Sequence, residues 1–118
     1  MKKVKNINSF VKEKINVGEK TYKQLLISSE EAPNFAMRKF TIEPNGFMPL
    51  HNNTVEHEQY ILNGSAEVQI GDEILQVKKD DIVFIPAEVF HSYKNIGNDN
   101  FEFLCLVPNK EDKITLKK

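Results

Sequence analysis

The sequence has few of the features that mark several large classes of protein. It contains one cysteine, Cys105, in 118 residues, so no disulfide can form within the chain, which fits a reducing compartment. Its apolar runs are short, and none approaches the roughly 20 residues that span a bilayer. The first residues carry charges where a signal peptide has an apolar segment. These absences lead us to expect a cytoplasmic protein with no membrane partner.

No charge of one sign dominates either. The 16 lysines and arginines nearly balance the 17 aspartates and glutamates, and nucleic-acid binding would need a clustered positive surface, so we expect none. The length and the 40% of hydrophobic residues suit one domain with one core. We predict a single domain over residues 1–118, with its core over about 20–108, an N-terminal arm at 1–15 and a tail at 109–118.

Short β-prone segments are what the sequence has in quantity. Turn-forming residues separate them, as at Pro44-Asn45-Gly46 and Asn63-Gly64. Many short strands at a spacing of about 8–12 residues predict a sandwich or barrel. Residues 5–14 fit either a strand or a short helix. The predicted strands are residues 21–28, 34–43, 58–63, 65–70, 73–78, 82–85, 89–94 and 101–107.

One charged residue lies on a predicted core face. Alternation along residues 36–42 puts Arg38 on the same face as Phe40 and Ile42. An arginine there is unusual and needs a partner. Two interpretations stay open: an inward guanidinium, or a rim arginine whose stem packs while its head reaches water.

The three histidines are the strongest chemical signal. His51 and Asn53 are two residues apart and face the same way on a strand, His57 opens the next strand, and His91 lies in a late strand after Pro86. Three neutral imidazoles from separate strands suit Zn, Mn, Fe, Co, Ni or Cu. The alternative is scattered surface or hydrogen-bonded histidines, which is the commoner case for any single histidine.

Around these histidines the chain resembles the cupin family. The first cupin motif runs G-x5-H-x-H-x3,4-E-x6-G, and it aligns with Gly46, His51, Asn53, His57 and Gly64. The gap from glycine to the first histidine is one residue short. Asn53 stands in place of the second histidine, and His57 in place of the glutamate.

The second cupin motif runs G-x5-P-x-G-x2-H-x3-N. Pro86, His91 and Asn95 match it, while Asp80 and Glu88 replace its two glycines. The resemblance implies an all-β fold, the double-stranded β-helix or jelly-roll barrel, with two packed antiparallel sheets and little helix.

A narrower resemblance is to small bacterial and archaeal cupins with a four-histidine manganese site, H-x-H-x3-H-E. The stretches APNFAMRKFTIEPNG, EHEQYILNG and EFLCLVP are similar to theirs, over most of residues 30–108. It implies one divalent metal ion on His51, His57 and His91. Asn53 replaces the fourth histidine and is a weak oxygen ligand, a support for a metal-bound water, or a side chain that points away. Glu58 alternates with His57 and is expected to face outward.

The resemblance also implies a small-molecule pocket beside the metal. Arg38 is a catalytic candidate that would bind a substrate carboxylate with its planar fork. Tyr93 is a second candidate, as a hydrogen-bond donor or as packing. The expected pocket residues are Arg38, Gln59, Ile61, Tyr93, Phe103 and Cys105.

The function that follows is a metal-dependent oxidoreductase, dioxygenase-like, acting on a small organic substrate that bears a carboxylate. The alternatives are a metal-dependent isomerase or decarboxylase and a non-catalytic module that binds a small ligand or a metal, because fold alone does not separate them. Cupins of this size also imply a homodimer, in which residues 5–14 could cover an edge strand of the partner.

Overall fold

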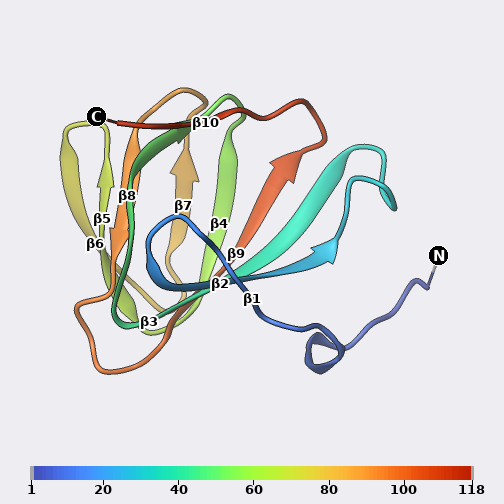
Figure 1. Cartoon of the computed structure of the whole chain (residues 1–118), viewed down its shortest axis with the longest axis horizontal. Helices are drawn as coiled ribbons and strands as arrows, with labels where there is room; N and C mark the ends of the chain where they lie inside the picture. Colours follow the sequence, from blue (N-terminus) through green and yellow to red (C-terminus); the bar gives the residue numbers. More distant parts are fainter. Residues whose placement is uncertain (1, 118) are drawn as a thin grey trace.

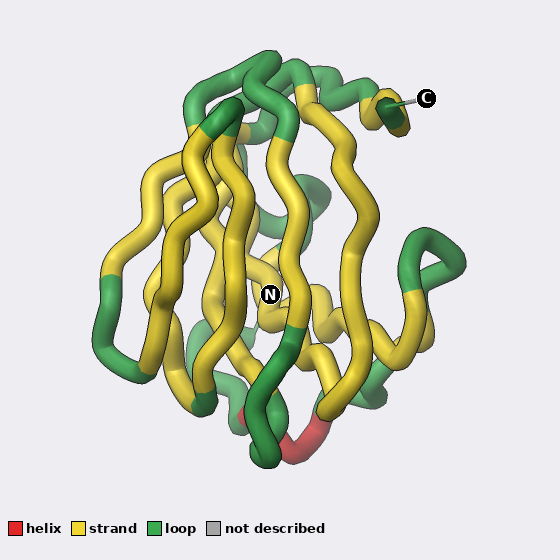
Figure 2. The backbone as a smooth tube through the Cα atoms, turned by 90° about the vertical axis from the view of Figure 1, so that its left-hand side faces the viewer, coloured by secondary structure: helices red, strands yellow, loops and turns green. Residues whose placement is uncertain are grey.

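The structure is a computed structural model that describes residues 2–117. One 10-stranded sheet, antiparallel at every pairing, curls on itself (Figure 2). Within residues 2–117 the helical structure is limited to the 3-10 turn η1, Ile7–Ser9, and no helix there is long and apolar enough to cross a membrane. The all-β jelly-roll prediction is confirmed. The strands are β1 Glu13–Lys14, β2 Glu19–Ile27, β3 Phe35–Asn53, β4 His57–Asn63, β5 Ser65–Ile70, β6 Glu73–Lys78, β7 Ile82–Ile85, β8 His91–Lys94, β9 Phe101–Pro108 and β10 Ile114–Leu116.

The long strand β3 runs through both halves of the curled sheet (Figure 1). Residues 35–42 pair with β2 and β9, and residues 47–53 pair with β8 and β10. Between them the strand bends, with Asn45 at φ 70°. A Cβ on Gly46 would lie 2.8 Å from two backbone carbonyl oxygens, so only glycine fits this crossing. The predicted turn at Pro44-Asn45-Gly46 is therefore wrong, because the bend lies inside one continuous strand.

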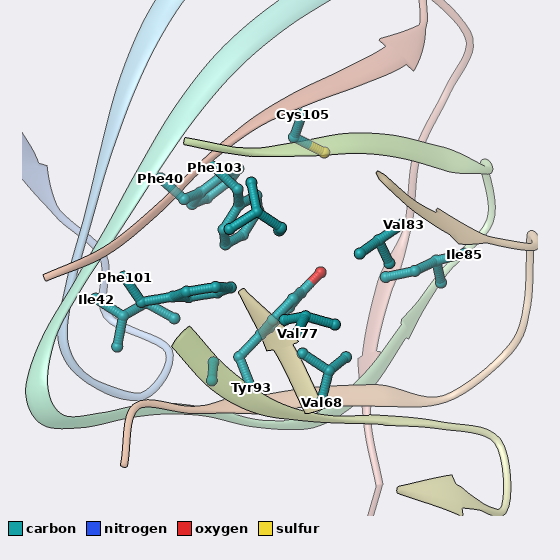
Figure 3. Packing of buried hydrophobic residues seen from close by; sticks show 12 residues of the cluster. Phe40, Ile42, Val68, Val77, Val83, Ile85, Tyr93, Phe101, Phe103 and Cys105 are labelled. Carbon is teal, nitrogen blue, oxygen red and sulfur yellow. The ribbon is translucent and has the colours of Figure 1, made fainter. Parts of the chain in front are cut away.

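The core lies between the two halves, where alternate residues of each strand point inward. Phe103 is 1% exposed and stacks between Phe40 and Tyr93, with ring centroids 5.3 and 5.0 Å away (Figure 3). Burial of such a ring stabilises the fold by about 1.5–3 kcal/mol. These stacked aromatic residues pack next to the histidines.

Two of the four non-glycine residues with positive φ among residues 2–117 lie at glycine positions of the second cupin motif. Asp80 and Glu88 have φ values of 75° and 73°, and they occupy the two positions at which the second cupin motif has glycine. The left-handed conformation costs a residue with a side chain roughly 1–2 kcal/mol. The turns of the motif are thus retained here without its glycines.

Both ends of the described chain pack onto the barrel. At the N-terminal end, the Nζ of Lys5 donates to the Leu26 carbonyl at 3.0 Å, and Gln24 donates to the Phe10 carbonyl at 3.0 Å. Residues 5–14, expected to be a strand or a helix, contain η1 and β1 and lie on their own β2. At the other end, the expected tail 109–118 contains the strand β10, which was not predicted; residues 1 and 118 lie outside the described range.

Candidate metal centre

Strand pairing brings the three histidines to one end of the barrel. His51 and Asn53 end β3, His57 opens β4 and His91 opens β8. His51 and His91 are direct partners in the β3–β8 pairing, with ring centroids 4.3 Å apart, and the ring of His57 lies 5.8 Å from that of His91. All four side chains are buried, at 6% exposure or less. Residues far apart in sequence therefore share one small volume.

Backbone carbonyls orient two of the rings. Nδ1 of His51 lies 2.7 Å from the Pro49 carbonyl oxygen, and Nδ1 of His91 lies 3.1 Å from that of Val89. A ring nitrogen that faces a carbonyl donates its proton, which leaves the lone pair on Nε2. The buried Nε2 atoms of His57 and His91 have no hydrogen-bond partner. Buried polar atoms without partners are costly, so these nitrogens are suited to an electron-pair acceptor.

The environment also keeps the rings neutral. Burial lowers the pKa of His57 to about 3, and the charges of Arg38 and of the other histidines act in the same direction. Burial likewise lowers the pKa of His91 to about 4, with His51 adding to the effect. The pKa of His51 is also lowered by burial, and Asp112 opposes the change. Neutral imidazole is the form that binds a metal.

Asn53 lies beside the same small cavity as the three histidines. Its Nδ2 donates to Oδ2 of Asp112 at 3.1 Å, while its buried Oδ1 has no hydrogen-bond partner. The side chain is buried, at 4% exposure, and each of the three roles that the sequence left open for Asn53 stays a prediction. Glu58, the carboxylate next to His57, is exposed, as expected from the alternation.

The candidate donor atoms lie near one another but are not arranged around a single point. Among residues 2–117, no three His, Cys, Asp or Glu side chains already meet in an arrangement that would hold an ion. Metal binding would require the rings to turn about their side-chain bonds. The donor chemistry nevertheless fits: neutral nitrogens, two of them without partners, and one amide oxygen match the preferences of the first-row transition metals.

A small cavity adjoins the histidines. Its volume of about 110 Å³ is the space of roughly three or four water molecules, so it admits a small organic molecule or one end of a larger one. Phe40 and Phe103 form part of its wall and Ile114 lies at it as well. Five of the six expected pocket residues line it. The exception is Ile61, which is fully buried among core residues and does not reach the cavity.

Arg38 lines this cavity and is half-buried. Its guanidinium lies 5.1 Å from the Phe40 ring centroid, and Nη2 donates to Sγ of Cys105 at 3.2 Å. Its Nε is buried without a partner. Within residues 2–117 no carboxylate forms an ion pair with it. Arg38 therefore retains donor capacity directed at the cavity.

The second catalytic candidate, Tyr93, is held by a neighbour. Its hydroxyl accepts a hydrogen bond from Nε2 of Gln59 at 2.6 Å, and burial raises its pKa, so the phenol stays protonated. Figure 3 shows the Tyr93 hydroxyl and the Cys105 sulfur entering the interior from different strands. Oε1 of Gln59 has no partner.

The sequence reasoning missed several residues at the site. Five of them, Ile15, Val17, Lys23, Phe40 and Met48, line the cavity, and two more come from the C-terminal segment. Asp112 contacts Asn53, and Ile114 lines the cavity, yet both lie in what was expected to be a tail. No local pattern marks them, because they reach the site only through the pairing of β10 with β3.

The fold, the three histidines and the motif spacing agree with one family. The Cupin_2 family model, a cupin domain, matches residues 38–107. The chain belongs to the cupin family. The matched range includes all three histidines and Arg38, and it ends before Asp112 and β10.

Curated relatives of this cupin are longer proteins. It is 29% identical over 77 residues to the 1-methylthio-D-xylulose 5-phosphate methylsulfurylase of Rhodospirillum rubrum, covering 65% of the chain and 49% of that protein. It is 39% identical over 57 residues to an uncharacterized protein of Methanocaldococcus jannaschii, covering 48% of the chain and 46% of that protein. The cupin thus spans about half the length of these relatives.

Solved structures share the fold. The polyketide cyclase RemF from Streptomyces resistomycificus superimposes with a TM-score of 0.92 at 24% identity, covering all of this cupin and 87% of that chain. A predicted oxalate decarboxylase from Thermotoga maritima gives a TM-score of 0.82 at 23% identity, covering 89% and 97%. At these identities the likeness shows the fold alone.

Proposed function

We propose that this cupin binds one divalent metal ion through His51, His57 and His91, with the amide oxygen of Asn53 as a weaker ligand. The observation that carries the proposal is that buried Nε2 atoms of His57 and His91 and the buried Oδ1 of Asn53 have no partners beside one cavity. A cation would satisfy all three atoms at once. The candidate metals are Mn, Fe, Zn, Ni, Co and Cu, and the resemblance to small manganese cupins favours Mn.

The substrate class follows from Arg38 and the size of the cavity. A guanidinium with an unpartnered Nε recognises carboxylates, and about 110 Å³ limits what enters to a few non-hydrogen atoms. We propose a small organic acid as the ligand. Arg38 would orient its carboxylate, Phe40 and Phe103 would exclude water, and the protonated Tyr93 would face it as a neutral phenol.

The reaction we propose is a dioxygenase-like oxidation of that acid. A bound transition metal would supply Lewis acidity and, if redox-active, electron transfer. The second candidate is decarboxylation or isomerisation without dioxygen. It is supported by Arg38 as a carboxylate site and by the likeness to a protein named as a predicted oxalate decarboxylase. A third possibility is a binding module without turnover.

Metal binding is tested first, with chelator-treated protein and Mn(II), Fe(II) or Zn(II) in a competition titration. One ion per chain is expected for the parent and for Glu58→Gln, which changes an exposed carboxylate next to the site. His57→Gln should weaken binding at least tenfold, since it removes a nitrogen ligand. Equal affinity of all three proteins would refute the assignment. Turnover of small acids under air and under argon then separates the oxidation from the dioxygen-independent reactions.

The substrate class has its own test. Small carboxylic acids should raise the melting temperature of the parent by mass action, and Arg38→Leu should abolish that rise while leaving the fold and metal binding intact. Lys94→Leu removes a positive charge at an exposed position and should keep the rise. Equal stabilisation of the Arg38→Leu variant by the acids would show that Arg38 does not bind them.

We further propose that residues 1–118 form one cupin domain, that the protein works in the cytoplasm, and that it is a homodimer. The single cysteine supports a reducing compartment. Since residues 5–14 lie on their own chain, the support for a dimer comes from another surface, the outer face of β3, β4, β7 and β9. It exposes large apolar side chains such as Phe35, Ile82 and Phe84.

A further inference from the structure

The last described residues return to the metal centre. β10 pairs antiparallel with the end of β3, where Leu116 lies opposite His51 and Ile114 lies opposite Asn53. In Figure 1 this strand, in red, crosses the end of the barrel. Ile114 lines the cavity at the histidines. Two of the four candidate ligands therefore sit on a strand whose pairing partner is the C-terminal segment.

One carboxylate in this segment fixes the orientation of Asn53. Oδ2 of Asp112 accepts a hydrogen bond from Nδ2 of Asn53 at 3.1 Å, and Oδ1 accepts from the backbone nitrogen of Thr54 at 3.0 Å. A carboxylate can only accept, so the Asn53 nitrogen must face Asp112. The amide oxygen is then turned the other way, where it is buried and has no partner.

Further contacts anchor the segment around Asp112. The backbone nitrogen of Lys113 donates to Oγ1 of Thr54 at 2.9 Å, and the backbone nitrogen of Lys117 donates to the Leu50 carbonyl at 3.0 Å. Residues 112–117 are thus hydrogen-bonded to the end of β3 at several points. The carboxylate of Asp112 also places a negative charge near a set of candidate ligands that is otherwise neutral.

We propose that Asp112 is a positioning residue for the metal centre, holding Asn53 with its amide oxygen toward the histidines, and that this contact couples β10 to the metal site. The inference rests on the proposed metal function. It assigns a role to a residue that touches no metal itself and acts through a ligand, as outer partners of metal ligands do.

The experiment is a competition titration in which Mn(II) or Zn(II) is added to three chelator-treated proteins. These are the parent, the Asp112→Ala variant and the Glu111→Ala variant. Glu111 is the matched control, because its side chain is exposed and its one ion pair among the described residues is with Lys113. Loss of an outer partner typically weakens metal binding by about 10–100-fold, and we expect this for Asp112→Ala. Glu111→Ala should stay within about twofold of the parent.

A double-mutant cycle separates positioning from a general effect of charge. If Asp112 acts through Asn53, the Asn53→Ala/Asp112→Ala protein should bind metal as Asn53→Ala alone does. A second readout is amide hydrogen exchange of residues 114–117, which should slow on metal addition in the parent and not in Asp112→Ala. Melting curves of the metal-free variants show whether each one is folded.

The outcomes are distinct. Metal binding by the parent with unchanged affinity in Asp112→Ala would overturn this inference and leave the proposed function standing. If Asp112→Ala weakened metal binding by the same factor in the parent and in the Asn53→Ala variant, this result would also overturn the positioning role. No metal binding by the parent would overturn both proposals.

Discussion

At the scale of single residues, Asn53 is where this chain departs from the four-histidine cupins that it resembles. Its amide nitrogen donates a hydrogen bond to Asp112, and its buried oxygen has no hydrogen-bond partner. An amide oxygen is a weaker ligand for most first-row metals than imidazole. The departure should leave a weaker and more open site, with one coordination position available to a substrate.

Asn53→His should rebuild a four-histidine set. The new ring can donate a hydrogen bond to Asp112 with one nitrogen and face the metal with the other, which is a favourable arrangement for a ligating histidine. We expect Mn(II) affinity to rise by roughly tenfold or more, as measured by competition titration. Unchanged affinity would place residue 53 outside the coordination sphere.

The histidines also predict an acid response of the metal-free protein. The pKa of His57 is lowered from 6.5 to about 3 in the fold, so between these values the unfolded chain binds a proton that the folded chain does not. The contribution of neutral His57 to the free energy of unfolding is therefore fully present above about pH 6.5, and it is lost as the pH falls toward 3. Urea unfolding of the chelator-treated protein from pH 7 to pH 4 should show this loss.

His57→Gln is the comparison for that measurement, because glutamine does not titrate. Its stability should fall less than that of the parent over the same pH range. Parallel curves for the two proteins would mean that His57 is not the group responsible.

At the scale of strands, the end of β8 is tied to the bend of β3 by one buried side chain. Asn95 is 1% exposed; its Nδ2 donates to the carbonyls of Ile42 and Asp99, and its Oδ1 accepts from the backbone nitrogen of Gly97. Asn95→Ala would leave these backbone groups without their partners. We expect a loss of about 2–4 kcal/mol in unfolding free energy, measured by urea denaturation. Asn98→Ala, at an exposed position, should cost less than about 0.5 kcal/mol.

The strands illustrate what sequence could and could not predict. Alternation and turn residues identified the β-rich fold and the inward positions of Gln59 and Cys105, because both signals are local. The continuity of β3 was missed, since the close approach at Gly46 involves a carbonyl of the neighbouring strand β2 as well as one of β3 itself. β10 was also missed, because its pairing with β3 joins residues about sixty positions apart and three residues are too short for their alternation to predict a strand.

The candidate site was likewise predictable from the sequence only in part. Strand alternation and motif spacing selected the three histidines, but only the fold places them around one cavity. Ile61 lies in the core and not at the cavity, because inward on a strand means toward the core as well as toward the cavity. Asp112 had no signal, since a lone aspartate in a polar tail resembles a solvated charge.

At the scale of the whole molecule, the outer sheet face is the largest feature that the metal centre does not use. A groove of about 710 Å³ is lined by Phe35, Met37 and Leu106, and Met37 and Leu106 continue into a second hollow lined by Ile82 and Phe84. Ile82 and Phe84 are 71% and 54% exposed. They lie on β7, which is at one edge of the sheet order. An exposed apolar face of this kind can meet the same face of a second copy across a two-fold axis, as in an isologous dimer.

Phe84→Glu should therefore convert a dimer to a monomer. The change places a charge in a surface that two copies would bury, where an unpaired charge is strongly unfavourable. Light scattering coupled to size-exclusion chromatography, over a range of protein concentrations, reports the mass directly. The matched control is Ile74→Glu, since Ile74 is 65% exposed and lies on β6, at the opposite edge of the sheet order; this variant should remain a dimer. A monomeric parent at about 100 µM, well above the Kd range of stable dimers, would contradict the prediction. Dissociation of both variants alike would also contradict it, because that result would place the interface outside the β7 face.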